Sequence, residues 1–291
     1  MGTVVTIGNF DGVHLGHQAL LQFAANVAKQ RGLNSLAITF EPHPAFLHNP
    51  TTAPELITGL EEKLEQLKAT GIGRVEVIPY TKHFAAQSDI EFIQNYLVNK
   101  YDAKVIVLGS DAKFGKGNTG DLSTLRAVAP GFKFDVIEFQ AVGSDDAPRW
   151  SSSAVREAIE RGDLREANQI LGRQHSVTGL VVHGDHRGRT LGFPTANLSE
   201  TQGLIPPDGV YAGYLDNQPA AISIGTNPTF TEAQEKRVEA YVLGRDDLDL
   251  YGQTVRLEFV AKIRDTLKFD SVDELISQMH DDIRQVERLS C

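Results

Sequence analysis

Hydrophobic and polar positions along the first half of the chain predict short buried strands separated by amphipathic helices. Apolar runs rich in β-branched residues predict strands at 4–7, 35–40, 75–78, 104–108 and 132–139. Apolar residues at helical spacing predict helices at 18–31, at 60–71, after a capping box formed by Ser88 and Glu91, and at 121–129. Strands that alternate with helices favour an α/β fold with a doubly wound parallel sheet and helices on both faces.

The pattern changes after Gly172. Two helices are predicted at 152–161 and 164–171, and short strands then follow at 177–182, 210–214, 221–224, 238–243 and 255–260. Closely spaced strands with little helix between them indicate an antiparallel barrel or sandwich. Ser271 and Glu274 form a second capping box before a terminal helix. We therefore predict two domains, 1–173 and 174–291.

Composition narrows the class of protein. The 291 residues, with 41% hydrophobic and 23% charged, are typical of a globular chain that is long enough for two cores. A net charge of −10 argues against a general nucleic-acid binder, and no apolar run approaches the roughly 20 residues of a membrane span. The single cysteine, Cys291, excludes an intramolecular disulfide. With nothing resembling a signal peptide, we expect a cytoplasmic protein with no nucleic-acid or membrane partner.

The first candidate site is the segment GNFDGVHLGH, residues 8–17, between the first strand and the first helix. We expect the helix to begin near His17, where unpaired backbone amides and the helix dipole favour an anion. His14 and His17 would flank that position and donate hydrogen bonds to a phosphate whose charge changes during reaction. Two ordinary surface histidines, or half of a metal site, are the alternatives.

Three other segments of the first 173 residues carry polar groups near predicted strand or helix ends. Glu41 and His43 lie in EPHP, and Asp111 lies in the glycine-rich loop GSDAKFGKGNTGD. The segment RWSSSAVR places Ser151, Ser152 and Arg156 at a helix start, where they can face a common anion or simply cap the helix. EPHP can equally be a rigid turn. The glycine-rich loop matches neither a Walker A loop nor a dinucleotide fingerprint.

The second half contains the most specific run, HGDHRGRTLGFPTANL, residues 183–198. Its glycines allow the backbone to wrap a phosphate, with Arg187 and Arg189 supplying charge. Thr195 and Asn197 alternate, so on an extended chain both point the same way and can bind Mg²⁺ together with phosphate oxygens. Glu239 lies on a predicted strand and can accept a proton from an attacking hydroxyl. A backbone bend and a solvent-facing glutamate are the respective alternatives.

These motifs, taken in order, resemble those of the bifunctional bacterial riboflavin kinase and FMN adenylyltransferase family, also called FAD synthetases. The resemblance extends from about residue 4 to residue 288 and rests on TIGNFDGVHLGHQ, TFEPHP, the GSDAKFGKGNTGD loop, RWSSSAVREAI, LGR, GRTLGFPTANL, GVYAG, SIGTNPTF, VEAYVL, DLYG and KFDSVDEL. It implies a Rossmann-like nucleotidyltransferase domain followed by a riboflavin kinase barrel with a terminal helix.

The resemblance also implies two reactions. In the barrel, ATP phosphorylates riboflavin to FMN, with Glu239 as general base and Thr195 and Asn197 as ligands of the magnesium nucleotide. In the first domain, FMN attacks a second ATP to give FAD and pyrophosphate; the residues that stabilise charge there are His14, His17, Ser151, Ser152 and Arg156. The implied ligands are riboflavin, FMN, FAD, ATP, ADP and pyrophosphate, with Mg²⁺ as cofactor. Further implied binding positions are Gly8, Asn9, Phe10, Asp11, Gly12, Asp111, Gly184, Arg189 and Gly192.

The chain departs from the family pattern in the glycine-rich loop. Ala112 replaces a usual aromatic residue, Lys113 a common arginine or threonine, and Asn118 a frequent arginine; Trp150 and Ser153 are milder changes. Family members normally carry more residues before the first strand, so we expect a weaker sheet edge there. Two alternatives follow: a riboflavin kinase with an impaired adenylyltransferase domain, and a non-catalytic flavin-binding regulatory protein.

Overall fold

The computed structural model describes residues 2–140, 150–184, 192–226, 236–245 and 249–290. They divide into two compact units. Unit 1 comprises Met1–Pro54 and Leu60–Arg149, and unit 2 comprises Glu55–Gly59 and Trp150–Cys291. The predicted boundary between residues 173 and 174 stays a prediction, and each unit is described by itself.

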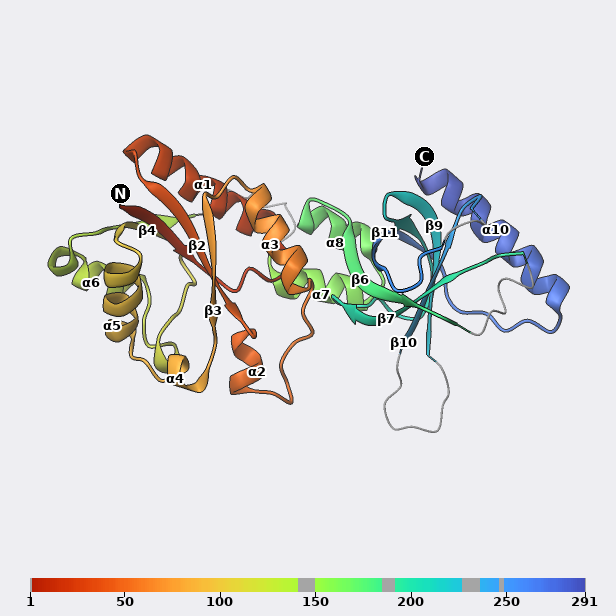
Figure 1. The fold of residues 1–291 in the computed structure, drawn as a ribbon, viewed down its shortest axis with the longest axis horizontal. Helices are drawn as coiled ribbons and strands as arrows, with labels where there is room; N and C mark the ends of the chain where they lie inside the picture. Colours follow the sequence, from red (N-terminus) through yellow and green to blue (C-terminus); the bar gives the residue numbers. More distant parts are fainter. Residues whose placement is uncertain (1, 141–149, 185–191, 227–235, 246–248, 291) are drawn as a thin grey trace. The chain divides into compact units, whose positions relative to one another are not determined.

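Unit 1 is built on a five-stranded parallel sheet with the order β3-β2-β1-β4-β5 (Figure 1). The predicted parallel sheet is thus confirmed. Because the strands are parallel, their carboxyl ends all lie at one edge, which is where ligands bind in sheets of this type. The strands are β1 (Thr3–Ile7), β2 (Asn34–Glu41), β3 (Arg74–Pro79), β4 (Ala103–Gly109) and β5 (Asp135–Phe139).

Helices cover both faces of this sheet, because successive strand residues point to opposite sides. Val4 packs with Leu21 of α1 and Leu67 of α3 in one core cluster. Its neighbour Val5 packs with Leu97 of η2 in the other, which also takes in residues of α5 and α6. The helical elements of unit 1 are η1 (Asp11–Val13), α1 (Leu15–Arg31), α2 (Pro44–His48), α3 (Leu60–Ala69), α4 (Lys82–Ala85), α5 (Asp89–Phe92), η2 (Ile93–Lys100), η3 (Lys116–Asn118) and α6 (Leu122–Phe132).

Two helix predictions need correction. Helix α1 begins at Leu15 rather than near His17, because the ring of His14 acts as N-cap and accepts from the backbone N–H of His17. Helix α6 continues through Pro130 to Phe132, so the strand predicted from residue 132 begins only at Asp135. The capping box of Ser88 and Glu91 is confirmed.

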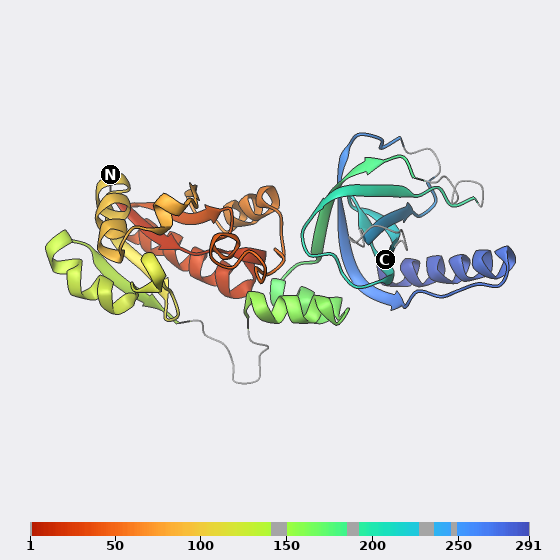
Figure 2. The same cartoon turned by 90° about the horizontal axis from the view of Figure 1, so that it is seen from below.

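Unit 2 is a closed antiparallel barrel with the order β10-β7-β6-β11-β8-β9, as the strand spacing predicted. A terminal helix lies along its outside (Figure 2). Strand β7 was not predicted, because its polar sequence lacks an apolar run. The elements are α7 (Ser152–Glu160), α8 (Leu164–Leu171), β6 (His175–Val182), β7 (Ala196–Gln202), β8 (Gly209–Leu215), β9 (Gln218–Thr226), β10 (Lys236–Val242), β11 (Thr254–Arg264) and α10 (Val272–Ser290).

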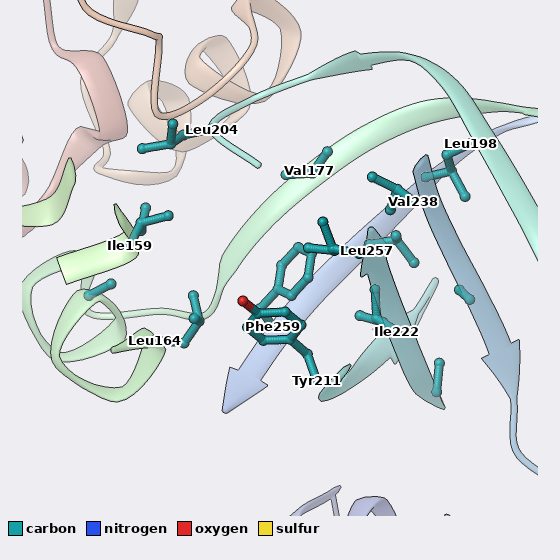
Figure 3. Packing of buried hydrophobic residues seen from close by; sticks show 14 of the residues in the cluster. Ile159, Leu164, Val177, Leu198, Leu204, Tyr211, Ile222, Val238, Leu257 and Phe259 are labelled. Carbon is teal, nitrogen blue, oxygen red and sulfur yellow. The ribbon is translucent and has the colours of Figure 1, made fainter. Parts of the chain in front are cut away.

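One apolar core joins the barrel to the two helices that precede it (Figure 3). Ile159 of α7 and Leu164 of α8 belong to the same buried cluster as Tyr211 and Phe259 of the barrel. Asn168 of α8 adds a polar tie, because its side-chain amide donates to the Phe259 carbonyl at 2.8 Å. The helices α7 and α8 therefore fold as part of unit 2.

Candidate active sites

The loop after β1 contains positive φ angles, which most side chains disfavour. Phe10 and Val13, both buried, have φ angles of 50° and 38°, and Gly12 between them has a φ of 76°. A β-branched residue with positive φ is an outlier that only firm surroundings hold in place. Such conformations are often found at functional sites.

His14 and His17 lie directly beyond this loop. Their rings stack with centroids 3.7 Å apart, and the ring of Phe10 contacts His17 edge-on at 5.2 Å. The His14 Nδ1 atom accepts from the His17 backbone N–H at 3.4 Å, so the pair occupies the first turn of α1. The predicted grouping of the two histidines at a helix start is present in the structure, two residues earlier than expected.

Burial determines the protonation state of His17. Burial, and secondarily the neighbouring His14, lowers the pKa of His17 well below its usual 6.5. The ring is therefore neutral near pH 7. Its Nδ1 atom is buried and has no hydrogen-bond partner in the described part of the chain. A neutral ring with an unpaired nitrogen at a helix N-terminus is equipped to take a ligand atom.

The remaining loop residues are fixed at the same edge of the sheet. Thr39 of β2 donates its hydroxyl to the Asn9 carbonyl at 3.1 Å, and the side chain of Gln18 donates to the Val13 carbonyl at 2.8 Å. Gly8 bonds through its backbone N–H to Ile38. These bonds connect the segment from Gly8 to Gly12 to the neighbouring strand and helix.

The EPHP segment lies at the carboxyl end of β2. Glu41 ends the strand, and Pro44 opens the short helix α2. His43 caps that helix, because its Nδ1 atom accepts from the Ala45 backbone N–H at 3.2 Å. A turn that leads directly into a helix accounts for the segment, and both polar side chains remain at the sheet edge that carries the histidine pair.

Asp111 lies in the turn that follows β4, and it is exposed. Since β4 is the neighbour of β1, Asp111 follows the strand end next to the Gly8–Gly12 segment. Two of the residues in this loop that differ from the family pattern have a local structural explanation. Asn118 has a φ of 58°, which asparagine tolerates better than arginine. Lys113 forms an ion pair with Asp121 at 3.0 Å. Ala112 packs against the core cluster that contains Val5.

Ser151, Ser152 and Arg156 lie at the start of α7, in unit 2. The Ser151 hydroxyl caps the helix and accepts from the Ala154 backbone N–H at 3.2 Å. Arg156 donates through Nε to the Glu55 carbonyl at 2.8 Å. The histidine pair belongs to unit 1, so the expected grouping of all five residues stays a prediction.

The barrel brings the second set of predicted residues together. Asn197 on β7 and Glu239 on β10 are register partners in the antiparallel ladder. The Thr195 hydroxyl donates to one Glu239 oxygen at 3.5 Å, and Asn197 donates to the Thr195 carbonyl at 3.4 Å. The Thr195 hydroxyl and the Glu239 carboxylate, 44 residues apart in sequence, thus meet beside the Asn197 amide at the start of β7.

Gly184 makes room for this grouping. A side-chain carbon on Gly184 would lie 2.5 Å from the amide atoms of Asn197, so any larger residue would displace that side chain. Gly192 has a φ of 87°, which favours glycine at the start of the segment that leads to Thr195. The predicted phosphate contact Arg189, together with Arg187 and Gly188, lies outside the described residues.

Sequence reasoning missed two neighbours of these sites. Arg237 pairs with the second Glu239 oxygen at 3.6 Å, and the two side chains are 39% and 27% exposed. Their spacing of two along a strand could have revealed that they share a face. His183 stacks on Tyr251 with ring centroids 3.9 Å apart, a contact that no local pattern foreshadows.

Both groupings carry donors and ligands that suit nucleotide phosphates, and they lie in an α/β sheet unit and a closed barrel unit. The sequence profile of the FAD synthetase family matches residues 1–154. That of the riboflavin kinase family matches residues 171–290. The chain belongs to the bifunctional riboflavin kinase and FMN adenylyltransferase family, as its motifs predicted.

Curated relatives are similar in sequence to this chain over almost its whole length. The bifunctional riboflavin kinase/FMN adenylyltransferase of Listeria monocytogenes is 38% identical over 286 residues, covering 96% of this chain and 90% of that protein. That of Escherichia coli K12 is 38% identical over 283 residues with the same coverage. The Bacillus subtilis protein is 34% identical over 295 residues, covering 98% and 92%.

A solved structure shows the same architecture. A crystal structure from Streptococcus pneumoniae, described as a macrolide-efflux protein, superposes with a TM-score of 0.86 at 32% identity, covering 98% of this chain and 94% of that one. In the described part of this chain, no helix is both long and apolar enough to cross a membrane.

Proposed function

We propose that this chain uses ATP to phosphorylate riboflavin to FMN in unit 2, and then joins FMN to the AMP moiety of a second ATP in unit 1. The products are ADP in the first reaction, and FAD and pyrophosphate in the second. The observation that supports this most strongly is that Asn197 on β7 and Glu239 on β10 meet together with Thr195, which directly precedes β7. A single cysteine in the chain fits a reducing, cytoplasmic setting.

In the kinase reaction, the Glu239 carboxylate accepts the proton of the terminal ribityl hydroxyl as its oxygen attacks the γ-phosphorus of ATP. An alcohol needs such a base, because it is not ionised at neutral pH. The contacts of Glu239 with the Thr195 hydroxyl and the Arg237 guanidinium hold the carboxylate in one orientation. Gly184, Arg189 and Gly192 belong to the segments that we assign to the nucleotide phosphates.

The donor set beside Glu239 fits Mg²⁺ bound as a magnesium nucleotide. A hydroxyl and an amide oxygen, from Thr195 and Asn197, are hard ligands of the kind that Mg²⁺ accepts, while phosphate oxygens and waters complete its shell. Among the described residues, no three His, Cys, Asp or Glu side chains are grouped so as to hold a metal without a nucleotide. The ion would supply charge neutralisation for the transferred phosphoryl group.

In the adenylyl transfer, a phosphate oxygen of FMN attacks the α-phosphorus of ATP and pyrophosphate leaves. The nucleophile is already ionised, so the protein has to orient the reactants and stabilise charge rather than remove a proton. We assign charge stabilisation to His14 and His17, with Ser151, Ser152 and Arg156 as further anion contacts. The segment from Gly8 to Gly12, with Asn9, Phe10 and Asp11, and the exposed Asp111 are assigned to the nucleotide and the flavin phosphate.

One incubation tests both activities. The purified chain is mixed with riboflavin, ATP and Mg²⁺, and the flavins are separated by chromatography. Accumulation of FAD through FMN supports the proposal. FMN alone indicates a kinase with an impaired adenylyltransferase unit, an alternative that the substitutions in the glycine-rich loop suggest. Unchanged riboflavin indicates a flavin-binding protein without activity.

A further inference from the structure

Unit 1 contains a buried lysine that neither proposed reaction uses. Lys63 on α3 is only 4% exposed, and within the described residues its ammonium group donates one hydrogen bond, to the Phe40 carbonyl at 3.5 Å. An ammonium group has three donors, and removing it from water is costly unless other charges compensate. A methionine of similar length would fill the same space without that cost.

Two carboxylates act electrostatically on this ammonium group. Burial lowers the pKa of Lys63, and the charges of Glu41, at the end of β2, and Asp11, in η1, oppose that shift. Asp11 is itself 4% exposed, and α3 packs against η1. The lysine thus lies where α3, the end of β2 and the loop after β1 come together.

We propose that Lys63 is a positioning residue for adenylyl transfer: its charge fixes Asp11 and the end of β2, and through them the backbone that carries His14 and His17. The inference rests on the proposed function of unit 1. It adds a residue on α3, outside all of the segments assigned above to nucleotide or flavin.

The loop geometry explains why a fixed charge is needed there. Asp11 lies between Phe10 and Val13, whose positive φ angles are unfavourable for side chains of their kind. His14 follows directly and places its ring against His17. The positive charge of Lys63 attracts Asp11 from the helix that packs against η1 and so opposes relaxation of this backbone. A shift of about 1 Å at a reacting group can cost about 100-fold in rate.

The test compares Lys63→Met with Lys68→Met, a matched change at an exposed position of the same helix. We expect Lys63→Met to lower kcat for the conversion of FMN to FAD by roughly 10- to 100-fold. The KM values for FMN and ATP should change by a smaller factor than kcat, because Lys63 lies outside the segments assigned to nucleotide and flavin and acts on them only through Asp11 and the end of β2. Lys68→Met should match the wild type, and riboflavin phosphorylation by the same Lys63→Met chain shows that unit 2 is intact.

The thermal stability of Lys63→Met separates positioning from a purely structural role. Since the substitution removes a buried charge that only partial contacts compensate, we expect no loss of melting temperature while kcat falls. An unchanged kcat, or a raised KM with kcat preserved, overturns the inference. A loss of kcat that merely follows a loss of melting temperature also overturns it.

A second variant keeps the inference testable if Lys63→Met does not fold. Glu41→Gln removes one of the two carboxylate charges at a half-exposed position and should lower the same kcat, by less than Lys63→Met does. No effect of Glu41→Gln in that case contradicts the inference. A wild-type chain that forms no FAD contradicts the proposed function instead, so the two failures are distinguishable.

Discussion

The carboxylate of Glu239 is restrained at both of its oxygens, by the Thr195 hydroxyl at 3.5 Å and by Arg237 at 3.6 Å. The alternation of Thr195 and Asn197 was enough to predict that they face the same way. That Glu239 is their neighbour could not come from spacing, because the pairing of β7 with β10 depends on the closure of the barrel. The same limit applies to His17, whose neutrality results from burial that sequence does not display.

Glu239→Gln should abolish riboflavin phosphorylation, because an amide cannot accept the proton of the attacking hydroxyl. Conversion of added FMN to FAD should continue at the wild-type rate, since Glu239 is not among the residues that we assign to that reaction. Steady-state assays of each half-reaction measure both effects. Glu258→Gln, a change of the same kind on β11 of the barrel, serves as the control. Normal FMN formation by Glu239→Gln contradicts the assignment of the base.

His17→Ala should have the opposite effect. Loss of one charge-stabilising donor should lower kcat for FAD formation by about 100- to 1,000-fold, with riboflavin phosphorylation retained. His83→Ala, at an exposed histidine of unit 1, is the matched control. If both variants convert FMN to FAD at equal rates, the histidine pair is not part of the site.

Capping residues and hydrophobic patterns predicted whether a segment is a helix or a strand more reliably than they predicted where it begins and ends. The box of Ser88 and Glu91 fixes the start of α5, since both reciprocal bonds form. Helix α1 starts earlier than expected because an imidazole replaces the usual serine or aspartate as cap. Strand β7 has a polar sequence, so only its ladders with β6 and β10 make it a strand. Tertiary pairing decided where local preference was weak.

Strand β6 makes the barrel sensitive to acid. His175 at its start is fully buried, and burial lowers its pKa to about 4, although the hydrogen bond between Nε2 and the Leu204 carbonyl at 2.7 Å opposes the shift. In the unfolded chain the same ring titrates near 6.5. The unfolded state therefore binds more protons between these values, and stability falls as pH drops through that range.

We expect a loss of about 3 kcal/mol in the free energy of unfolding of unit 2 between pH 7 and pH 4 from this group alone. Trp150, the one tryptophan, packs against the core of unit 2, so its fluorescence during denaturation follows that unit. His175→Gln, which cannot titrate, should show a shallower dependence on pH. Equal slopes for the two chains contradict the prediction.

Across the whole molecule, two successive architectures correspond to two family profiles, one ending at residue 154 and the other beginning at residue 171. The switch from helix-separated strands to closely spaced strands predicted this order. The helices α7 and α8 resemble, in their local sequence, further helices of the first fold, but Ile159 and Leu164 are buried in the core of the barrel unit. Which core an amphipathic helix joins depends on surfaces that its own sequence does not specify.

The two reactions leave different phosphorus atoms in the product. Riboflavin is incubated with the chain, Mg²⁺, and ATP that carries distinguishable labels at the α- and γ-phosphates, and the purified flavins are counted for each label. We predict FMN that carries only the γ label, and FAD that carries both labels in equal amounts. FAD without the γ label, flavins without the α label, or no labelled flavin would contradict the conclusion that this chain carries out both steps.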